Sequence, residues 1–408
     1  MAWNLEELYK DLHRHPELSF AEHRTAGIVV DHLRGLRFEV TSGIGRTGVV
    51  GVLRNGEGPT VMLRADLDAL PVVEATGLPY SSTVHAIAED GADVGVMRAC
   101  GHDIHIVCLI GAAERMAATR DAWSGTLIAL FQPAEEQGGG AQVMIDDGLY
   151  DIVPRPDVVL GQHVTPLPAG TLGAHPGAAM AAIDALTVRM FGRGGHGSRP
   201  ETTIDPVVMA AATVMRLQSV VSREVSGQET AVLTVGNLQA GTKNNIIPAE
   251  AVLGISLRSF SEEVRGRLLA AVERIVRAEA EASGAIVAPE LTLDEQYPVT
   301  VNDPDATERT MGAFRAAFGE QRVIDPGALT GSEDVGNLAT AAGVPLVYWL
   351  LGGGDPDAFA AAAAACTLER DVPSNHSPYF APVMQPTIST GVEALVVAAL
   401  EWLGATPR

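Results

Sequence analysis

The pattern of apolar and polar positions predicts buried strands that alternate with amphipathic helices. Apolar residues at helical spacing predict a helix from about 104 to 118, and the first forty residues also have a helical pattern. Continuous apolar runs are typical of strands buried on both faces of a sheet. Such runs lie at 48–53, 60–65, 126–131, 158–163 and 345–350. We therefore expect an α/β fold with an open, mostly parallel sheet.

Residues 183–293 have a different pattern, which indicates a separate, inserted unit. Alternating apolar and polar residues predict strands at 186–190, 231–238, 251–260 and 286–293. Asp205 begins one predicted helix between these strands, and Ser261 begins another. The order β-α-β-β-α-β is that of a ferredoxin-like module. We expect this module to be inserted into a larger domain made of residues 1–182 and 294–408.

The composition narrows the class of protein. The chain has 408 residues, of which 47% are apolar, and its 28 basic and 50 acidic residues give a net charge of −22. So acidic a chain is a poor partner for nucleic acid or anionic lipid. We see no signal-peptide pattern and no apolar run of membrane-spanning length, and three cysteines make no disulfide framework. We therefore expect a cytoplasmic protein that binds neither nucleic acid nor a membrane.

Residues that bind metals or move protons stand where the predicted strands end. Asp66 and Asp68 follow one apolar strand. Glu135 and Glu136 follow a second, and His163 ends a third. Because an open α/β sheet places its site outside the carboxyl ends of its strands, we expect these side chains to meet in one crevice.

Cys100 and His102 open the helix predicted near residue 104. Cysteine, histidine and glutamate are the ligand types that zinc and related ions prefer. We expect the helix N-terminus to lower the pKa of Cys100, which favours the thiolate that a metal needs. A cysteine nucleophile is the alternative, and it requires a free histidine as base. His376, in the turn-rich segment SNHSPYF, is a further candidate ligand.

The adjacent glutamates have a specific use beside a divalent ion. One of the two carboxylates binds the metal, while the other stays free to take a proton from water. A pair of glutamates is more often a solvated surface feature. Here Glu135 and Glu136 lie between a buried strand and a glycine-rich turn, which favours the functional interpretation.

The inserted unit carries three candidate residues of its own. His196 lies among glycines in GGHGS, which indicates close approach of the backbone. Arg258 is expected on the face of its strand opposite the apolar residues, where it is suited to clamp a substrate carboxylate. A surface salt bridge is the alternative for Arg258. Asn245 lies just before the same strand.

The motifs together resemble a known family. The chain contains, in order, HRHPEL, RADLDALP, ACGHDIH, QPAEEQGGGA, GQHV, GGHGSRP, NNIIP, GSED and NHSPYF. This set is similar to that of the amidohydrolases that include hippurate hydrolase, auxin-conjugate hydrolases and bacterial N-acyl-amino-acid aminoacylases. They form a branch of the carboxypeptidase-G-like dinuclear metallopeptidases. The likeness covers almost the whole chain, and segments such as GGHGSRP are nearest the aminoacylases of acyl-glutamine type.

The resemblance implies a site for two divalent ions, with zinc expected and manganese or cobalt as further candidates. The implied ligands are Cys100, His102, Glu136, His163 and His376. Among them Cys100 takes the bridging position. Asp66 is implied as a carboxylate that supports the ligands.

The resemblance also implies how a substrate is bound and cleaved. Glu135 is the implied general base, and Asn245 and Arg258 are implied to hold the carbonyl and carboxylate of the substrate. His196 is implied to reach the active site of the other subunit of a homodimer. In this scheme residues 183–293 form a lid through which the two subunits pair.

The expected activity is metal-dependent hydrolysis of N-acyl-L-amino acids to a carboxylate and a free amino acid. A dipeptidase, an N-carbamoyl-amino-acid hydrolase or a xenobiotic amide hydrolase of the same fold are alternatives. A binding or scaffold protein that kept the fold without the chemistry is disfavoured, because the ligand set and Glu135 are complete.

Overall fold

A computed structural model describes residues 4–88 and 91–405 of the chain. It divides into two compact units. The first comprises the residues up to Ala179, Val301–Gly327 and the residues from Asp334 onward, and the second comprises Met180–Thr300 and Ala328–Glu333. The domain limits expected from the sequence, 183 and 293, fall inside the second unit and stay a prediction.

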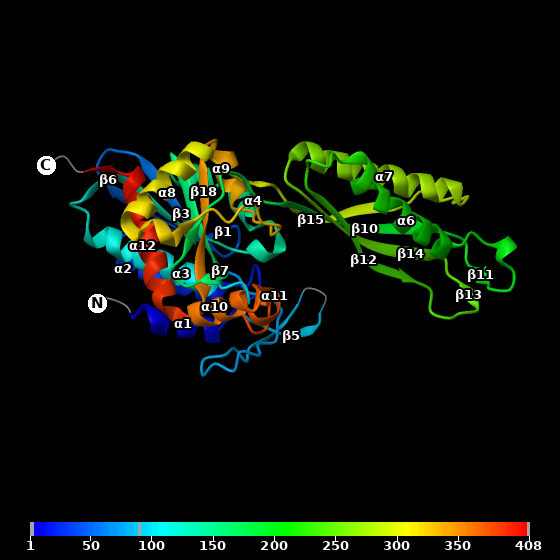
Figure 1. The fold of residues 1–408 in the computed structure, drawn as a ribbon, viewed down its shortest axis with the longest axis horizontal. Coiled ribbons are helices and arrows are strands. Elements are labelled where there is room, and N and C mark those ends of the chain that lie inside the picture. The colour runs from blue at the N-terminus through cyan, green and yellow to red at the C-terminus, as the bar shows by residue number, and fades with distance from the viewer. Residues whose placement is uncertain (1–3, 89–90, 406–408) are drawn as a thin grey trace. The chain divides into compact units, whose positions relative to one another are not determined.

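The first unit is built around a central sheet whose middle strands are parallel (Figure 1). β6 pairs with β3, β3 with β7, and β7 with β18, all in parallel, whereas β1, β2 and β8 join by antiparallel pairing. The expectation of an open, mostly parallel sheet is confirmed. In sheet order the strands are β1 (Glu39–Ile44), β2 (Gly48–Asn55), β6 (Trp123–Gln132), β3 (Thr60–Asp66), β7 (Val158–Pro168), β18 (Leu346–Gly354), β8 (Leu172–Gly173) and β17 (Val323–Ile324), with β19 (Gly404–Ala405) on β6.

Helices pack on this sheet through a large apolar core. α3 is buried along nearly its whole length, because apolar residues surround it and it lies against both β3 and α12. The predicted helix at 104–118 is confirmed and begins two residues earlier, at His102. The helices are α1 (Leu5–Arg14), α2 (His23–Gly35), α3 (His102–Ala118), α4 (Gly140–Asp146), α5 (Leu149–Ile152), α8 (Pro304–Phe318), α9 (Gly336–Ala342), α10 (Pro356–Ala364), α11 (Leu368–Asp371) and α12 (Met384–Trp402).

Shorter elements complete the first unit. β4 (His85–Ile87) and β5 (Asp93–Gly95) form a hairpin, and the short helix η1 (Glu135–Gln137) follows β6. Gly101 precedes α3 with φ +85, a left-handed conformation that glycine adopts without cost. Within the described parts of the chain, no helix combines the length and apolar composition that crossing a membrane requires.

The second unit is an antiparallel sheet of order β12-β14-β10-β15 with two helices packed side by side (Figure 1). The chain order β-α-β-β-α-β agrees with the ferredoxin-like expectation. The elements are β10 (Ala182–Phe191), α6 (Pro206–Glu224), β12 (Ala231–Ala240), β14 (Glu250–Ser259), α7 (Glu262–Ala282) and β15 (Glu290–Tyr297). A ribbon of β11 (Gly195–His196) and β13 (Ile246–Ile247) extends from the sheet.

The last strand of the module lies further along the chain than expected. β15 spans Glu290–Tyr297, whereas the apolar pattern predicted 286–293. Ile286 and Val287 are 80% and 56% exposed and lie outside the sheet. Pro289, directly before β15, has no N–H to donate to a neighbouring strand, so pairing with β10 starts beyond it, at Glu290.

Candidate metal centre

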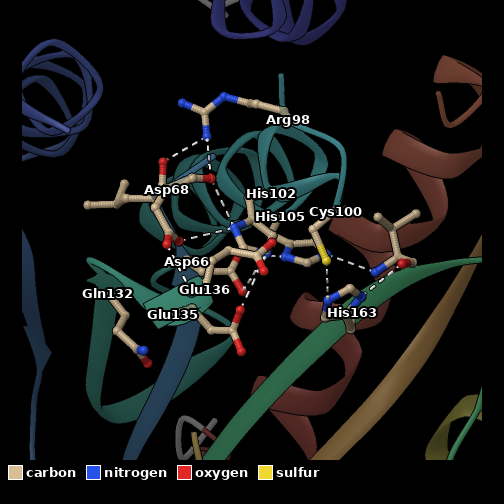
Figure 2. Close-up of polar contacts among 12 residues, drawn as sticks. Asp66, Asp68, Arg98, Cys100, His102, His105, Gln132, Glu135, Glu136 and His163 are labelled. Carbon is tan, nitrogen blue, oxygen red and sulfur yellow. Dashed lines mark hydrogen bonds and ion pairs between the residues drawn. The ribbon is translucent and has the colours of Figure 1, made fainter. Parts of the chain in front are cut away.

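The potential ligand atoms of five residues lie close together at the carboxyl edge of the central sheet. Figure 2 labels Cys100, His102, Glu136 and His163 among them. Cys100 Sγ lies 3.4 Å from His163 Nε2 and 3.3 Å from His376 Nε2. Glu136 joins the group on both sides, with Oε2 3.4 Å from His376 Nε2 and Oε1 3.7 Å from His102 Nε2. The structure therefore brings together all five residues that the resemblance implied as ligands.

These residues come from four segments that are far apart in the sequence. Cys100 and His102 lie at the start of α3, Glu136 lies in η1 directly after β6, and His163 lies within β7. His376 lies in the loop before α12 with φ +70, and its N–H donates to the carbonyl of Ala99 at 2.8 Å. The backbone bond holds the loop against the segment that carries Cys100.

His163 and His102 each use Nδ1 in a hydrogen bond to a backbone carbonyl, so their Nε2 atoms face the cluster. His163 Nδ1 donates to the Val164 carbonyl at 2.8 Å, and His102 Nδ1 donates to the Asp68 carbonyl at 3.0 Å. In the neutral form of each ring, Nε2 is then the nitrogen without a proton, which is the form that a metal requires. Burial lowers the pKa of His163 well below its ordinary value, which keeps this ring neutral.

Two polar atoms of the cluster are buried without a hydrogen bond among the described residues: His102 Nε2 and Glu136 Oε1. A buried polar atom without a hydrogen bond is costly, so such atoms usually mark a bound water or ion. Thiol, imidazole and carboxylate together form a donor set suited to zinc and its neighbours in the first transition row. The residues present therefore fit a metal centre.

The charge of the cluster supports the same conclusion. Burial raises the pKa of Glu136 to about 8, although His102 opposes this shift. Burial alone lowers the pKa of His102, but Asp66 and Asp68 outweigh it and raise the pKa to about 10. Three buried carboxyl groups, those of Asp66, Asp68 and Glu135, lie around His102, with Glu136 beside them, and a divalent cation at this place would stabilise their ionised forms.

The expected lowering of the Cys100 pKa is wrong. Burial, followed by the charges of Glu136 and Glu135, raises the pKa of this thiol well above its ordinary value. The residue is 6% exposed, and removal of a thiolate from water outweighs the helix N-terminus. A coordinated cation deprotonates such a thiol outright, so Cys100 fits a ligand better than a free nucleophile.

Asp66 supports the ligands through hydrogen bonds. Its Oδ1 accepts from His105 Nδ1 at 2.5 Å, and its Oδ2 accepts from the Arg64 guanidinium at 2.7 Å. His105 Nε2 in turn accepts the backbone N–H of Val164 at 2.8 Å. Asp66 therefore helps to fix the segment of β7 that carries His163.

Asn375 was not identified from the sequence. Its side-chain amide donates to the carbonyl of Cys100 at 3.0 Å and to the carbonyl of Val164 at 3.1 Å. It thereby ties the loop of His376 to the two segments that carry Cys100 and His163. The available signal was its position beside a candidate ligand in NHSPYF.

In the second unit, the structure brings His196 and Asn245 together. The ribbon pairs His196 with Ile246, and the N–H of Gly197 donates to the Asn245 carbonyl at 2.9 Å. A Cβ at Gly197 would lie 3.1 Å from that oxygen, which confirms the close backbone approach expected for GGHGS. His196 is exposed, and its Nδ1 accepts the Ser198 hydroxyl at 2.8 Å.

Arg258 lies on β14, on the face opposite the buried side chains of Leu253, Ile255 and Leu257. This placement is as expected. Its guanidinium donates to the carbonyl of Thr330 at 2.5 Å, within the same unit. The same nitrogen, Nη1, also donates to the Ser332 hydroxyl at 3.4 Å, so both hydrogen bonds are made by one end of the guanidinium.

The chain is similar in sequence to known hydrolases. A sequence model of peptidase family M20/M25/M40 matches residues 62–374. The hippurate hydrolase of Campylobacter jejuni is 37% identical over 81% of this chain and 84% of its own. The N-acyl-L-amino acid amidohydrolase of Geobacillus stearothermophilus is 38% identical over 76% of this chain and 80% of its own.

A solved structure is similar over nearly the entire chain. The YXEP protein of Bacillus subtilis, described as a dinuclear metal binding peptidase of the M20 family, has a TM-score of 0.75 and 27% identity. The match covers 98% of both chains. Together with the family match, it confirms the resemblance found in the motifs. The chain belongs to peptidase family M20/M25/M40.

Proposed function

We propose that this chain hydrolyses the amide bond of N-acyl-L-amino acids to a carboxylate and a free amino acid. The observation that carries the proposal is the buried carboxylate of Glu135 beside the ligand cluster. Its Oε2 lies 3.9 Å from His102 Nε2, and the residue is 5% exposed. The activities named for the Campylobacter and Geobacillus relatives are reactions of this kind.

Five residues would hold two divalent ions at this site: Cys100, His102, Glu136, His163 and His376. We propose zinc as the ion, because the set combines a thiol, imidazoles and a carboxylate; manganese and cobalt are the alternatives. When bound, such ions lower the pKa of water toward neutrality and polarise a carbonyl.

The chain's own residues then have distinct tasks. Glu135 takes a proton from the attacking water and passes it to the leaving amine. His196 donates a hydrogen bond to the developing oxyanion, and Asn245 binds the carbonyl of the substrate. Arg258 binds the carboxylate of the amino acid, for which its planar guanidinium is suited.

We propose that His196 acts in the active site of a second copy of the chain, in a homodimer that pairs through the second unit. β12 is an edge strand of its sheet, with Leu238 43% exposed. On the neighbouring helix α6, Val208 is 64% and Met215 74% exposed. An open strand edge beside apolar side chains supports pairing between copies. The free cysteines support a cytoplasmic location.

Peptide cleavage is the second candidate, because the YXEP protein is named a peptidase. A dipeptide offers the same scissile amide and the same terminal carboxylate. N-Carbamoyl amino acids differ only in the acyl part, and xenobiotic amides can differ on both sides of the amide bond; both keep the C–N bond that the proposed reaction cleaves.

Release of free amine from a substrate panel tests the proposal. The panel contains N-acetyl, N-benzoyl and long-chain N-acyl amino acids, with dipeptides and N-carbamoyl amino acids for comparison. Each sample is divided between added zinc or manganese and a chelator. Metal-dependent release from N-acyl amino acids is expected. Release from dipeptides or carbamoyl substrates alone would assign a different substrate class. No release of amine from any substrate, with metal bound, would reject the proposal.

A further inference from the structure

The backbone directly before Glu135 has an uncommon conformation. β6 ends at Gln132, and Ala134 then turns the chain into η1 with φ +47 and ψ 46. This is the left-handed region, which a residue with a side chain rarely adopts unless its surroundings hold it there. Ala134 is fully buried. The position of Glu135 therefore depends on whatever fixes Ala134.

Glu22 makes the contact that fixes it. Glu22 is fully buried, and its Oε1 accepts the N–H of Ala134 at 2.8 Å. Its Oε2 accepts the hydroxyl of Thr47 at 2.5 Å, from the turn between β1 and β2. Both carboxylate oxygens are thus engaged, so the side chain of Glu22 is itself held in one orientation.

A second carboxylate holds the other side of Glu135. The N–H of Glu136 donates to Asp68 Oδ2 at 2.9 Å, and Ser19 donates its hydroxyl to the same oxygen at 2.7 Å. The two backbone N–H groups that flank Glu135 therefore end on two different buried carboxylates. One comes from the start of α2 and the other follows the end of β3.

We propose that Glu22 is a positioning residue for the general base: by holding the N–H of Ala134 in the left-handed turn, it sets the place of the Glu135 carboxylate. This inference rests on the function proposed above for Glu135. No candidate ligand contacts Glu22 in the hydrogen bonds described, and Asp68 holds the N–H of Glu136 independently, so we expect the metal content to stay unchanged when Glu22 is replaced.

The size of the effect follows from the kind of bond that is lost. A hydrogen bond to an ionised carboxylate is stronger than a neutral one, and its loss frees Ala134 to relax toward ordinary backbone angles. Displacement of a catalytic group by ~1 Å costs about 100-fold in rate. We therefore expect Glu22→Ala to lower kcat about 100-fold, with KM and metal content unchanged.

Two further variants separate positioning from folding. Glu22→Gln keeps an oxygen that accepts the Ala134 N–H, and the Thr47 hydroxyl can reverse to accept from the new amide, so kcat should stay within about tenfold of wild type. Glu17→Ala is the matched control. Glu17 accepts the N–H groups of Arg24 and Thr25 at 2.9 and 2.8 Å, so it caps the same helix without touching Ala134.

Amide hydrogen exchange of the segment 131–140 is measured on all three variants with metal bound, beside kcat, KM and metal content. Glu22→Ala should speed exchange in this segment, whereas Glu17→Ala should leave it unchanged. Unchanged exchange or unchanged kcat in Glu22→Ala would overturn the proposal. An equal loss in Glu17→Ala, or a loss of metal from Glu22→Ala, would do the same.

The exchange measurement also separates this proposal from the proposed function. If the wild type releases no amine from any substrate, the function assigned to Glu135 fails on that result. The contact between Glu22 and Ala134 is then judged by exchange alone, where faster exchange in Glu22→Ala supports it and unchanged exchange rejects it.

Discussion

Asp66 Oδ1 lies 2.5 Å from His105 Nδ1, and both side chains are buried beside the ligand cluster. His105 accepts the N–H of Val164, whose carbonyl accepts the ring N–H of His163. A continuous set of hydrogen bonds therefore runs from a carboxylate at the end of β3 to His163, a candidate ligand in β7. Partners of this kind fix the tautomer and the angle of a ligating ring.

Replacing His105 with Ala should weaken metal binding by about 10- to 100-fold, because Asp66 and Val164 both lose a partner. His175→Ala is the matched control. His175 pairs with Asp325 at 2.9 Å in the same unit and contacts none of the ligands in the hydrogen bonds described. Competition with a chromophoric chelator measures both affinities, and equal losses in the two variants would contradict the role of His105.

His13 should make stability depend on pH in the alkaline range. Its Nδ1 lies 2.7 Å from Asp103 Oδ2 and its Nε2 lies 3.1 Å from Glu74 Oε1. Burial alone lowers the pKa of His13, but the bonds to Asp103 and Glu74 outweigh it and raise the pKa to about 9. The folded state therefore binds this proton more tightly than the unfolded chain does.

This difference in proton binding determines how stability changes with pH. Because the pKa is raised on folding, the contribution of His13 is complete below about pH 6.5 and is lost as the pH rises through 9. Its size is about 3 kcal/mol. The free energy of unfolding of wild type minus that of His13→Gln should thus shrink between pH 6.5 and about 9.5. A difference that stays constant over this range would show that His13 is not charged in the folded protein.

The same substitution should affect turnover at Glu135 and metal content at Glu136. Glu135→Gln should keep the full metal content and lose about 10³-fold in kcat, as expected for a general base. Glu136→Gln should lower metal content, because a carboxylate beside His102 and His376 is lost. Metal analysis and turnover on the same preparations test this division. Near-normal turnover of Glu135→Gln would contradict the assignment of Glu135 as the general base.

Mixing of inactive variants tests whether His196 acts across a dimer. His196→Ala should lose activity with its metal retained, because His196 belongs to the second unit and lies outside the ligand cluster. After subunits are exchanged with Glu135→Gln, activity should return to roughly a quarter of the wild-type value, since one site in four then has both residues. Absence of any recovery in verified mixed dimers would count against the role of His196.

The five candidate ligands stay a prediction, but the sequence did indicate that they lie close together. Metal-binding residue types stood after predicted strands and at a helix start, and the carboxyl ends of parallel strands meet at one edge of a sheet. His163 differs in detail, because β7 continues past it to Pro168. The family, the fold class and the class of enzyme are confirmed by the family match and the relatives. β15 was placed too early, because the apolar pattern continued through Pro289, which cannot donate to a neighbouring strand.

The buried contacts that support the site could not be predicted from the sequence pattern. Glu22 lies 112 residues from Ala134 in the sequence, and His13 lies 90 residues from Asp103. No local pattern indicates which buried carboxylate accepts which N–H. The pKa of Cys100 was misjudged because the helix start is visible in the sequence, whereas the burial of the thiol depends on the folded loop around His376.

Titration of the metal-free protein with zinc, with amine release and bound metal measured in the same samples, tests the central claim most directly. We expect no release without metal and a rise in activity that is complete at about two ions per chain. Full activity after exhaustive chelation, or two bound ions without release from any N-acyl amino acid, would contradict it.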